Sequence, residues 1–235
     1  MVNRADSCRR AEACPLVSKP VGPIDRLSSR SPGERALQTR ERILDMTAAL
    51  VREVPFKDLT PALVTQRSGL TPPAFYRYFA GLNDALAACG ETMRADVDEL
   101  ADAVAAGRWQ GPAAVGAASD VIDAFVAFWS RHRPLYRVID LLADEGDKRF
   151  VSLRQHMFEA LTARLVTVTA PVDDRDPVIV AGIVVATLVH VTAREPGFVK
   201  SGITRSELRR HLAVHVASAV TGSFATSRAA KSRRT

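Results

Sequence analysis

Two short segments with the same entry chemistry, separated by a glycine turn, constrain the fold of this chain more than any other feature. Thr60-Pro61 and Thr71-Pro72 each place a threonine at an expected helix N-cap and a proline at the first helical position, where an amide hydrogen would lack an intrahelical partner anyway. Between them, Ser68-Gly69-Leu70 supplies a tight turn with a glycine where left-handed backbone is expected. Two short helices over 60–67 and 71–78, joined in this way, are typical of a helix-turn-helix unit.

Helical periodicity covers most of the remaining chain. Ile43, Leu44, Thr47, Leu50 and Val51 recur at helical spacing and predict a helix over 38–53 that Pro55 ends. A capping box is predicted at Thr204 and Glu207. Further helices are predicted over 82–106, 112–132, 134–143, 148–169, 177–194 and 204–224. No strand-length alternation bounded by hairpin turns is found, so the sequence predicts an all-α fold of about nine helices.

The positive charge of the chain is concentrated at its two ends. The net charge is +6, yet residues 1–40 carry +4 and residues 228–235 carry another +4. Residues 1–35 are rich in Pro, Ser, Arg and Gly without apolar periodicity, which predicts a flexible basic arm. Residues 226–235 are predicted to form a disordered basic tail. Basic tails attract any polyanion, so this charge alone does not indicate sequence-specific binding.

Several classes of protein are disfavoured by what the sequence lacks. The three cysteines, Cys8, Cys14 and Cys89, form no metal-binding pattern and fit a reducing compartment. No apolar secretory signal begins the chain, and the uncharged run from Pro177 to Ala193 is shorter than the roughly 20 residues of a spanning helix, which favours a buried helix. We therefore expect a soluble, cytoplasmic protein without a membrane partner.

Catalytic and metal-binding motifs are not found either. The sequence has no glycine-rich phosphate loop, no metal triad and no nucleophile elbow, so we expect neither an enzyme nor a cofactor. His211 and His215 lie four residues apart at a spacing that could hold a metal, but no third ligand is evident, and a surface or interface pair is favoured.

The residues around the glycine turn resemble those of a known family. A first amphipathic helix, the stretch from Thr60 to Phe79 that ends Gly-Leu-Thr-x3-Phe-Tyr-Arg-Tyr-Phe, and then Ala85-Leu86 closely resemble the TetR family of transcriptional regulators. The resemblance implies a two-domain, all-α homodimer. A helix-turn-helix domain over 36–82 would bind a palindromic operator in double-stranded DNA, and a domain over 83–225 would dimerise and hold a small-molecule effector.

The same resemblance assigns the DNA-contacting positions. Phosphate contacts fall on Thr60, Tyr76 and Tyr78, base contacts fall on Pro72, Pro73 and Ala74, and Thr71 and Arg77 complete the predicted set. The chain departs from the family at Leu82, where the family usually has a phosphate-anchoring lysine. Its recognition helix also begins with Pro-Pro-Ala and carries no bidentate guanine reader, which leaves apolar contact with thymine methyl groups as the direct readout. We hypothesise that the basic arm compensates for this weak charge.

The effector and dimer sites are assigned more loosely. Phe125, Trp129, His132, Met157 and Leu161 are the candidate ligand-binding residues, with plain core packing or surface exposure as the alternative for each. The aliphatic, aromatic-poor composition favours an apolar effector. By the same resemblance, the helices over 177–194 and 204–224 would form the dimer interface, with buried monomer core as the alternative.

The function indicated by these residues is DNA-binding transcriptional repression, relieved by a small-molecule inducer. One alternative is a helical ligand-binding protein that has lost sequence-specific DNA binding, which Leu82 and Pro72-Pro73 keep open. The other is an enzyme, which turnover of a bound small molecule would identify.

Overall fold

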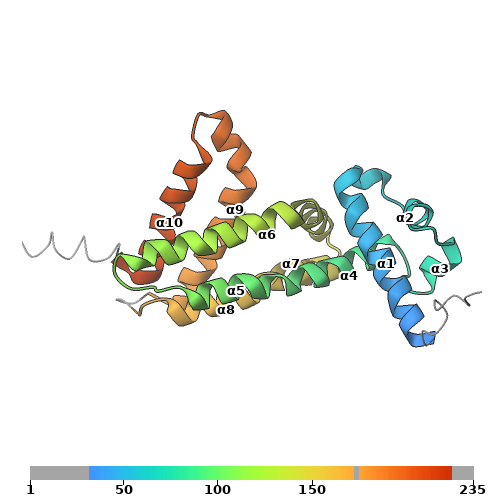
Figure 1. Cartoon of the computed structure of the whole chain (residues 1–235), viewed down its shortest axis with the longest axis horizontal. Helices are drawn as coiled ribbons and strands as arrows, with labels where there is room; N and C mark the ends of the chain where they lie inside the picture. The colour runs from blue at the N-terminus through green and yellow to red at the C-terminus, as the bar shows by residue number, and fades with distance from the viewer. Residues whose placement is uncertain (1–31, 172–174, 224–235) are drawn as a thin grey trace, which may run out of the picture. The chain divides into compact units, whose positions relative to one another are not determined.

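A computed structural model describes residues 32–171 and 175–223, and every regular element in these ranges is a helix (Figure 1). Most of the predicted arm, the predicted tail, Cys8 and Cys14 lie outside the described residues. Contacts divide the chain into residues 1–38 and 39–235, and all packing described below lies within the second unit. The described elements are α1 (Pro32–Glu53), a 3₁₀ turn η1 (Phe56–Asp58), α2 (Pro61–Ser68), α3 (Pro72–Tyr76), α4 (Leu82–Ala95), α5 (Val97–Ala106), α6 (Ala113–Asp144), α7 (Lys148–His156), α8 (Glu159–Val168), α9 (Pro177–Lys200) and α10 (Arg205–Thr221).

Helix α1 begins six residues before the predicted start at residue 38. Leu37 is the one large apolar side chain among the six added residues and is 63% exposed, so these residues lack the apolar spacing on which the prediction depended. A proline at the first helical position and Glu34 in the first turn favour a helix start at this point. Further along, Ile43 and Leu50 are fully buried, and the Thr47 hydroxyl donates to the Ile43 carbonyl at 2.8 Å, which hides the one polar group on that face.

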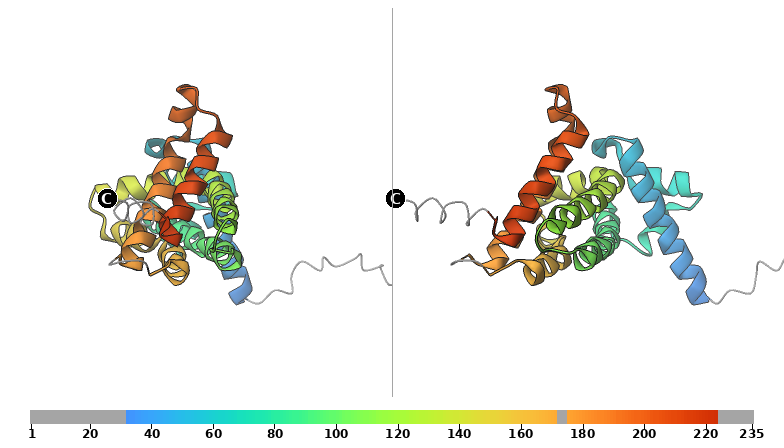
Figure 2. Two further views of the ribbon diagram at one scale, coloured as in Figure 1. Left: turned by 90° about the vertical axis from the view of Figure 1, so that its left-hand side faces the viewer. Right: turned by 60° about the vertical axis from the view of Figure 1, so that its left-hand side comes forward.

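The helices after residue 82 pack around one another. Helix α6 contacts α5, α7 and α10, and α5 lies along α8. Helices α9 and α10 form an antiparallel pair, as the two views agree (Figures 1 and 2). The pair turns at residues 201–204, where the Thr204 side chain caps α10 and Glu207 completes the predicted capping box. The described helices thus agree with an all-α fold of about nine helices.

Four predictions of where the helices after residue 82 end or divide were wrong. The helix predicted over 177–194, with a break at Pro196-Gly197, continues through Pro196 to Lys200. A break was predicted at Arg133-Pro134, but α6 continues through Pro134 for 32 residues, because a proline inside a well-packed helix removes one hydrogen bond without necessarily ending it. The single helices predicted over 82–106 and 148–169 are each divided. The first division falls at Asp96 and the second at Met157 and Phe158, where Phe158 leaves helical geometry.

Helix α9 is buried on one face only, whereas a buried helix was predicted. Ala181, Val184 and Leu188 pack inward, but Ile179 and Ile183 are more than half exposed. Within the described residues, α6 and α9 are both long and apolar enough to cross a membrane by length and composition. Core helices of soluble proteins pass the same test, so the two helices are weak evidence for a membrane protein.

Candidate functional site

The turn between α2 and α3 has the geometry that the sequence predicts. The Thr60 hydroxyl accepts a hydrogen bond from the Leu63 amide at 3.2 Å and caps α2. Gly69 adopts left-handed backbone with φ 65° and ψ 31°, and the following Leu70 amide donates to the Thr65 carbonyl at 2.9 Å. This closed turn sets the direction in which the chain enters α3.

Helix α3 is shorter than the predicted 71–78, and its predicted cap is only partly formed. Thr71 has extended backbone but makes no side-chain capping bond. The reason lies in the next two residues, because Pro72 and Pro73 have no amide hydrogens and the Ala74 amide already donates to the Thr71 carbonyl at 2.9 Å. The Thr71 side chain is therefore left exposed, beside a helix start formed by two exposed prolines.

The outward surface of α3 is backed by an aromatic core. Phe75 is fully buried and Phe79 is 5% exposed, and their rings lie 5.7 Å apart. Tyr76 is 57% exposed, and Arg77 is exposed with its guanidinium 5.9 Å from the centre of the Tyr78 ring. The structure places all the predicted DNA-contacting residues on or beside α2 and α3, exposed or partly exposed: Thr60, Thr71, Pro72, Pro73, Ala74, Tyr76, Arg77 and Tyr78.

Arg42 of α1 is a further cation near this unit that the sequence analysis did not select. A side chain added at Gly69 would lie 3.5 Å from its guanidinium, so Arg42 reaches the turn between α2 and α3. The neighbouring Arg67 is paired instead with Glu53 at 2.7 Å. Nothing local in the sequence singles out Arg42, because its proximity to Gly69 depends on how α1 packs.

Four of the predicted effector residues belong to the buried core around α6. Phe125, Met157 and Leu161 are fully buried and Trp129 is 6% exposed. The Phe125 and Trp129 rings are stacked, with centroids 6.3 Å apart. None of these four lines either of the two cavities described below, so packing explains them as well as binding does.

A cavity of about 730 Å³ lies beside this core, and two aromatic side chains in its wall contact core residues. Tyr136 of α6 and Phe158 of the α7–α8 junction line it, and both contact the predicted residues: Tyr136 lies 5.2 Å from Trp129 and Phe158 lies 5.7 Å from Phe125. The rest of the lining comes from α7, α8 and α9: Arg154, Gln155, His156, Glu159, Thr162, Ala163, Val166, Val178, Gly182, Val185, Ala186, Val189 and His190.

Tyr136 was not among the predicted effector residues, although it lies on the same face of α6 as Trp129. Tyr136 follows Trp129 by seven residues, which is two helical turns and the same face. The predicted break at Pro134 separated the two residues, and only the continuous α6 brings them together.

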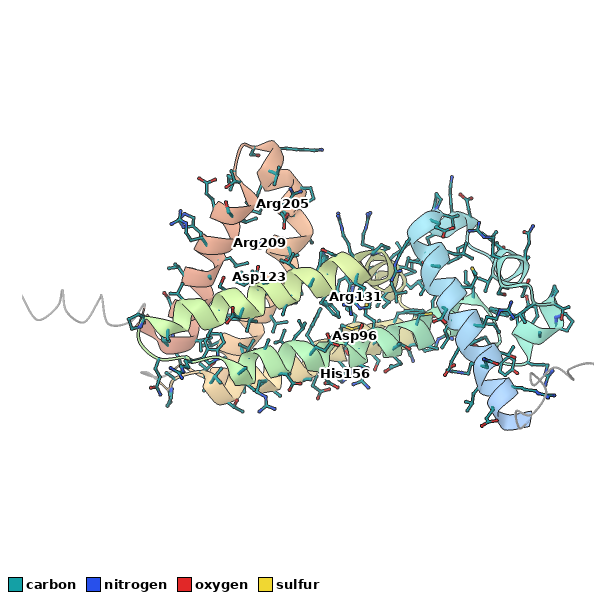
Figure 3. All side chains as sticks on the ribbon, in the orientation of Figure 1. Asp96, Asp123, Arg131, His156, Arg205 and Arg209 are labelled. Carbon is teal, nitrogen blue, oxygen red and sulfur yellow. The ribbon has the colours of Figure 1, made fainter. Side chains whose placement is uncertain are left out.

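His132, the fifth predicted effector residue, lies apart from the others in a smaller cavity. This cavity of about 350 Å³ is bounded by α1, α4 and α6. The His132 Nε2 lies 2.8 Å from a carboxylate oxygen of Asp96, which also accepts from Arg131 at 3.4 Å. Asp96 and Arg131 are labelled in Figure 3. Burial lowers the pKa of His132, while the hydrogen bond to Asp96 opposes that shift.

Cys89 closes the inner wall of the same smaller cavity as a neutral thiol. Burial and the nearby Asp45 raise the pKa of Cys89 to about 12. Its sulfur lies 3.5 Å from the Leu44 carbonyl. A thiol in this state is neither a nucleophile nor a metal ligand, and no group of three or more metal-ligating side chains gathers within 32–171 and 175–223.

The exposed face of α9 is apolar and includes small residues. Val178, Ile179 and Ile183 are between 57% and 61% exposed, and Gly182 and Ala186 lie among them on the same side. A side chain built at Gly182 would meet no atom within 4 Å. Small residues beside exposed branched ones allow close approach of another helix.

A comparison with models of known protein families identifies the family of this chain. Residues 100–227, more than half of the chain, match the family model of the tetracyclin repressor-like C-terminal domain. The chain belongs to the TetR family. Its all-helical structure and the helix-turn-helix geometry of α2 and α3 agree with this assignment.

Solved structures share the TetR fold at low sequence identity. The Streptomyces coelicolor A3(2) protein SCO7518 is 19% identical, with 78% of this chain and 99% of that one covered at a TM-score of 0.61. A TetR-family transcriptional regulator from Streptomyces coelicolor is 18% identical over 81% and 86% of the two chains, with a TM-score of 0.57. The fatty acid degradation regulator FadR from Bacillus halodurans is 14% identical over 82% and 97%, with a TM-score of 0.56. At these identities the likeness establishes the fold, and no curated protein matches the chain in sequence.

Proposed function

We propose that this TetR-family protein is a transcriptional repressor that binds a palindromic operator as a homodimer and releases it when a small apolar molecule binds. The family is one of transcriptional regulators, not of enzymes. The observation that carries the proposal is the exposed surface of α3, where Pro72, Pro73 and Tyr76 point outward from the buried Phe75 and Phe79.

The chemistry of that surface favours a particular kind of DNA contact. Tyr76 and Tyr78 hydroxyls and the Arg77 guanidinium donate to phosphate oxygens and position the helix without reading sequence. Pro72, Pro73 and Ala74 offer only apolar contact, which suits thymine methyl groups in the major groove. We therefore expect an operator with thymines at the positions that Pro72, Pro73 and Ala74 contact.

A homodimer through α9 and α10 follows from the exposed face of α9. An apolar surface of this kind is costly in water, and a second copy of the same face would cover it around a two-fold axis. Two recognition helices spaced about 34–36 Å apart would then enter successive major grooves of one operator. In this proposal, residues 36–82 form the DNA-binding domain and residues 83–225 form the domain that dimerises and binds the effector. The protein would act on DNA in the cytoplasm.

The cavity beside the α6 aromatic core is the proposed effector site. Its volume of about 730 Å³ and the side chains of Val166, Val185 and Val189 in its wall suit a drug-sized, largely apolar molecule. Val178, Gly182 and Ala186 of the exposed α9 face line the same cavity, so the second copy in the proposed dimer would form part of its wall. An effector acts by favouring a conformation in which the two α3 helices no longer match the groove spacing, and it shifts the equilibrium only by its difference in affinity for the two conformations.

The first test is in-vitro selection of random duplex DNA with the full chain at physiological salt. Enrichment of an inverted repeat is the expected result. Arg77→Gln should weaken binding of the selected DNA by about five- to tenfold and reduce the salt slope by about one. The control is Arg164→Gln, which removes the same charge from an exposed position on α8 and should leave affinity within about twofold. A folded dimer that enriches no sequence would support instead a helical ligand-binding protein without operator reading.

The basic arm is tested separately. A chain lacking residues 1–31 keeps α1 intact and should show a flatter dependence of operator affinity on salt, because fewer counterions are released on binding. An unchanged dependence of affinity on salt would show that the arm does not replace the phosphate contact that is missing at Leu82.

A further inference from the structure

The indole of Trp129 is buried without a hydrogen-bond partner. Its side chain is 6% exposed, and its Nε1 meets no acceptor in the described part of the chain. The other tryptophan behaves differently, because Trp109 Nε1 donates to the Val104 carbonyl at 2.9 Å. A buried N–H without an acceptor is unfavourable and uncommon in folded proteins, so this one needs an explanation.

The position of Trp129 relative to the cavity suggests that explanation. Tyr136 covers Trp129, with ring centres 5.2 Å apart, and Tyr136 itself lines the cavity of about 730 Å³. Burial raises the pKa of Tyr136, so the phenol stays neutral. Trp129 does not itself line this cavity, and Tyr136 is a lining residue whose ring contacts the Trp129 indole.

The charges around the cavity decide which acceptor can bind there. Arg154, the arginine in its wall, is already paired with Asp140 at 3.1 Å and Asp144 at 2.6 Å. An anionic ligand at Arg154 would thus meet two carboxylates beside the guanidinium. Glu159 in the wall disfavours an anion further. The acceptor that fits is an uncharged oxygen.

We propose that Trp129 is the hydrogen-bond donor to the effector, and that the effector is a largely apolar molecule with an uncharged carbonyl oxygen, of the ketone, ester or lactone class. The inference rests on the proposed function in one respect, namely that the cavity between α6, α8 and α9 is the effector site. It adds the donor, the role of Tyr136 as the cover, and the chemical class of the ligand.

The test uses the ¹⁵N-labelled full chain and two probes of nearly the same shape, 2-acetylnaphthalene and 2-ethylnaphthalene. The chain has two tryptophans, so its spectrum contains two indole N–H peaks, which Trp109→Phe assigns. The ketone should move the Trp129 peak downfield and leave the Trp109 peak in place. It should also bind about tenfold more tightly than the hydrocarbon, which is the typical effect of one buried hydrogen bond.

Trp129→Phe removes the N–H and keeps an aromatic ring. In this variant the preference for the ketone should disappear. Comparing both probes on the same variant cancels any change in packing, since the packing change affects both alike. Tyr136→Phe keeps the covering ring and should retain most of the preference.

Three results would overturn the inference. One is a long-lived water on the Trp129 N–H of the free protein, seen as a cross-peak between the indole proton and water. Another is a ketone preference that survives in Trp129→Phe. The third is equal or absent binding of the two probes to the wild-type chain. Operator selection uses the free protein and does not involve Trp129, so a chain that selects an operator but fails here refutes only this inference.

Discussion

Replacing Gly182 with glutamate should separate dimerisation from folding. Gly182 lies within α9 on its exposed apolar face, and a side chain added there meets no atom within 4 Å. The folded protomer therefore has room for the new side chain. In the proposed dimer the same space holds the helix of the second copy.

The two effects of the Gly182→Glu change have opposite signs. In the protomer, glutamate is a better helix former than glycine, and the free energy of unfolding should rise by about 0.5 kcal/mol. In the dimer, the change introduces a bulky charge into a close helix contact, which costs about 1–3 kcal/mol. Because two-fold symmetry repeats the change on both sides, a cost near 1.4 kcal/mol per side corresponds to a dissociation constant about 100-fold higher.

Sedimentation equilibrium measures the dimer, and urea unfolding of the monomeric variant measures the protomer. Gly116→Glu is the matched control, because Gly116 is a helical glycine of α6 whose added side chain also meets no atom within 4 Å. The control should dimerise like the wild type. A Gly182→Glu protein that dimerises as tightly as the control would refute the assignment of the α9 face, and one that fails to fold would refute the claim of open space.

Three further changes test local features. Gly69→Ala forces a left-handed backbone on a residue with a side chain and should lower the free energy of unfolding by about 1 kcal/mol in urea titrations, whereas no change would mean that the turn does not require glycine. Burial lowers the pKa of His132 from 6.5, so the unfolded chain takes up this proton first. The wild type should therefore lose stability as the pH falls below about 6.5. His132→Gln should show a shallower loss in the same pH series, and parallel curves would exclude this contribution. Because burial raises the pKa of Cys89 to about 12, roughly one thiol in ten thousand is ionised near pH 8. Iodoacetamide should thus leave Cys89 unmodified by mass spectrometry in a folded chain with Cys8 and Cys14 changed to serine, and rapid labelling would contradict the burial.

Features built from a few neighbouring residues were predictable from the sequence. The cap at Thr60, the left-handed Gly69 and the capping box of Thr204 and Glu207 all formed as predicted. Each depends on hydrogen bonds or backbone sterics within about four residues. The same locality explains why the motif from Thr60 to Phe79 was sufficient to indicate the TetR family.

Predictions that depended on distant contacts were less successful. The division at Asp96 accompanies contacts with Arg131 and His132, which lie 35 and 36 residues further along the chain. The division at Phe158 places that ring against Phe125 and Tyr136 of α6. In both cases the contacting residues lie too far along the chain to be inferred from the sequence near the point where the helix divides.

The sequence by itself determined the helical class and the helix-turn-helix, because helix caps, turn backbone and apolar spacing are encoded within each segment. The tertiary structure alone decided that α6 continues through Pro134, that Tyr136 comes to cover Trp129, and that α9 keeps one apolar face exposed. These features depend on side-chain packing between segments that are far apart in the chain, and the spacing of residues within one segment does not show which other segment it contacts.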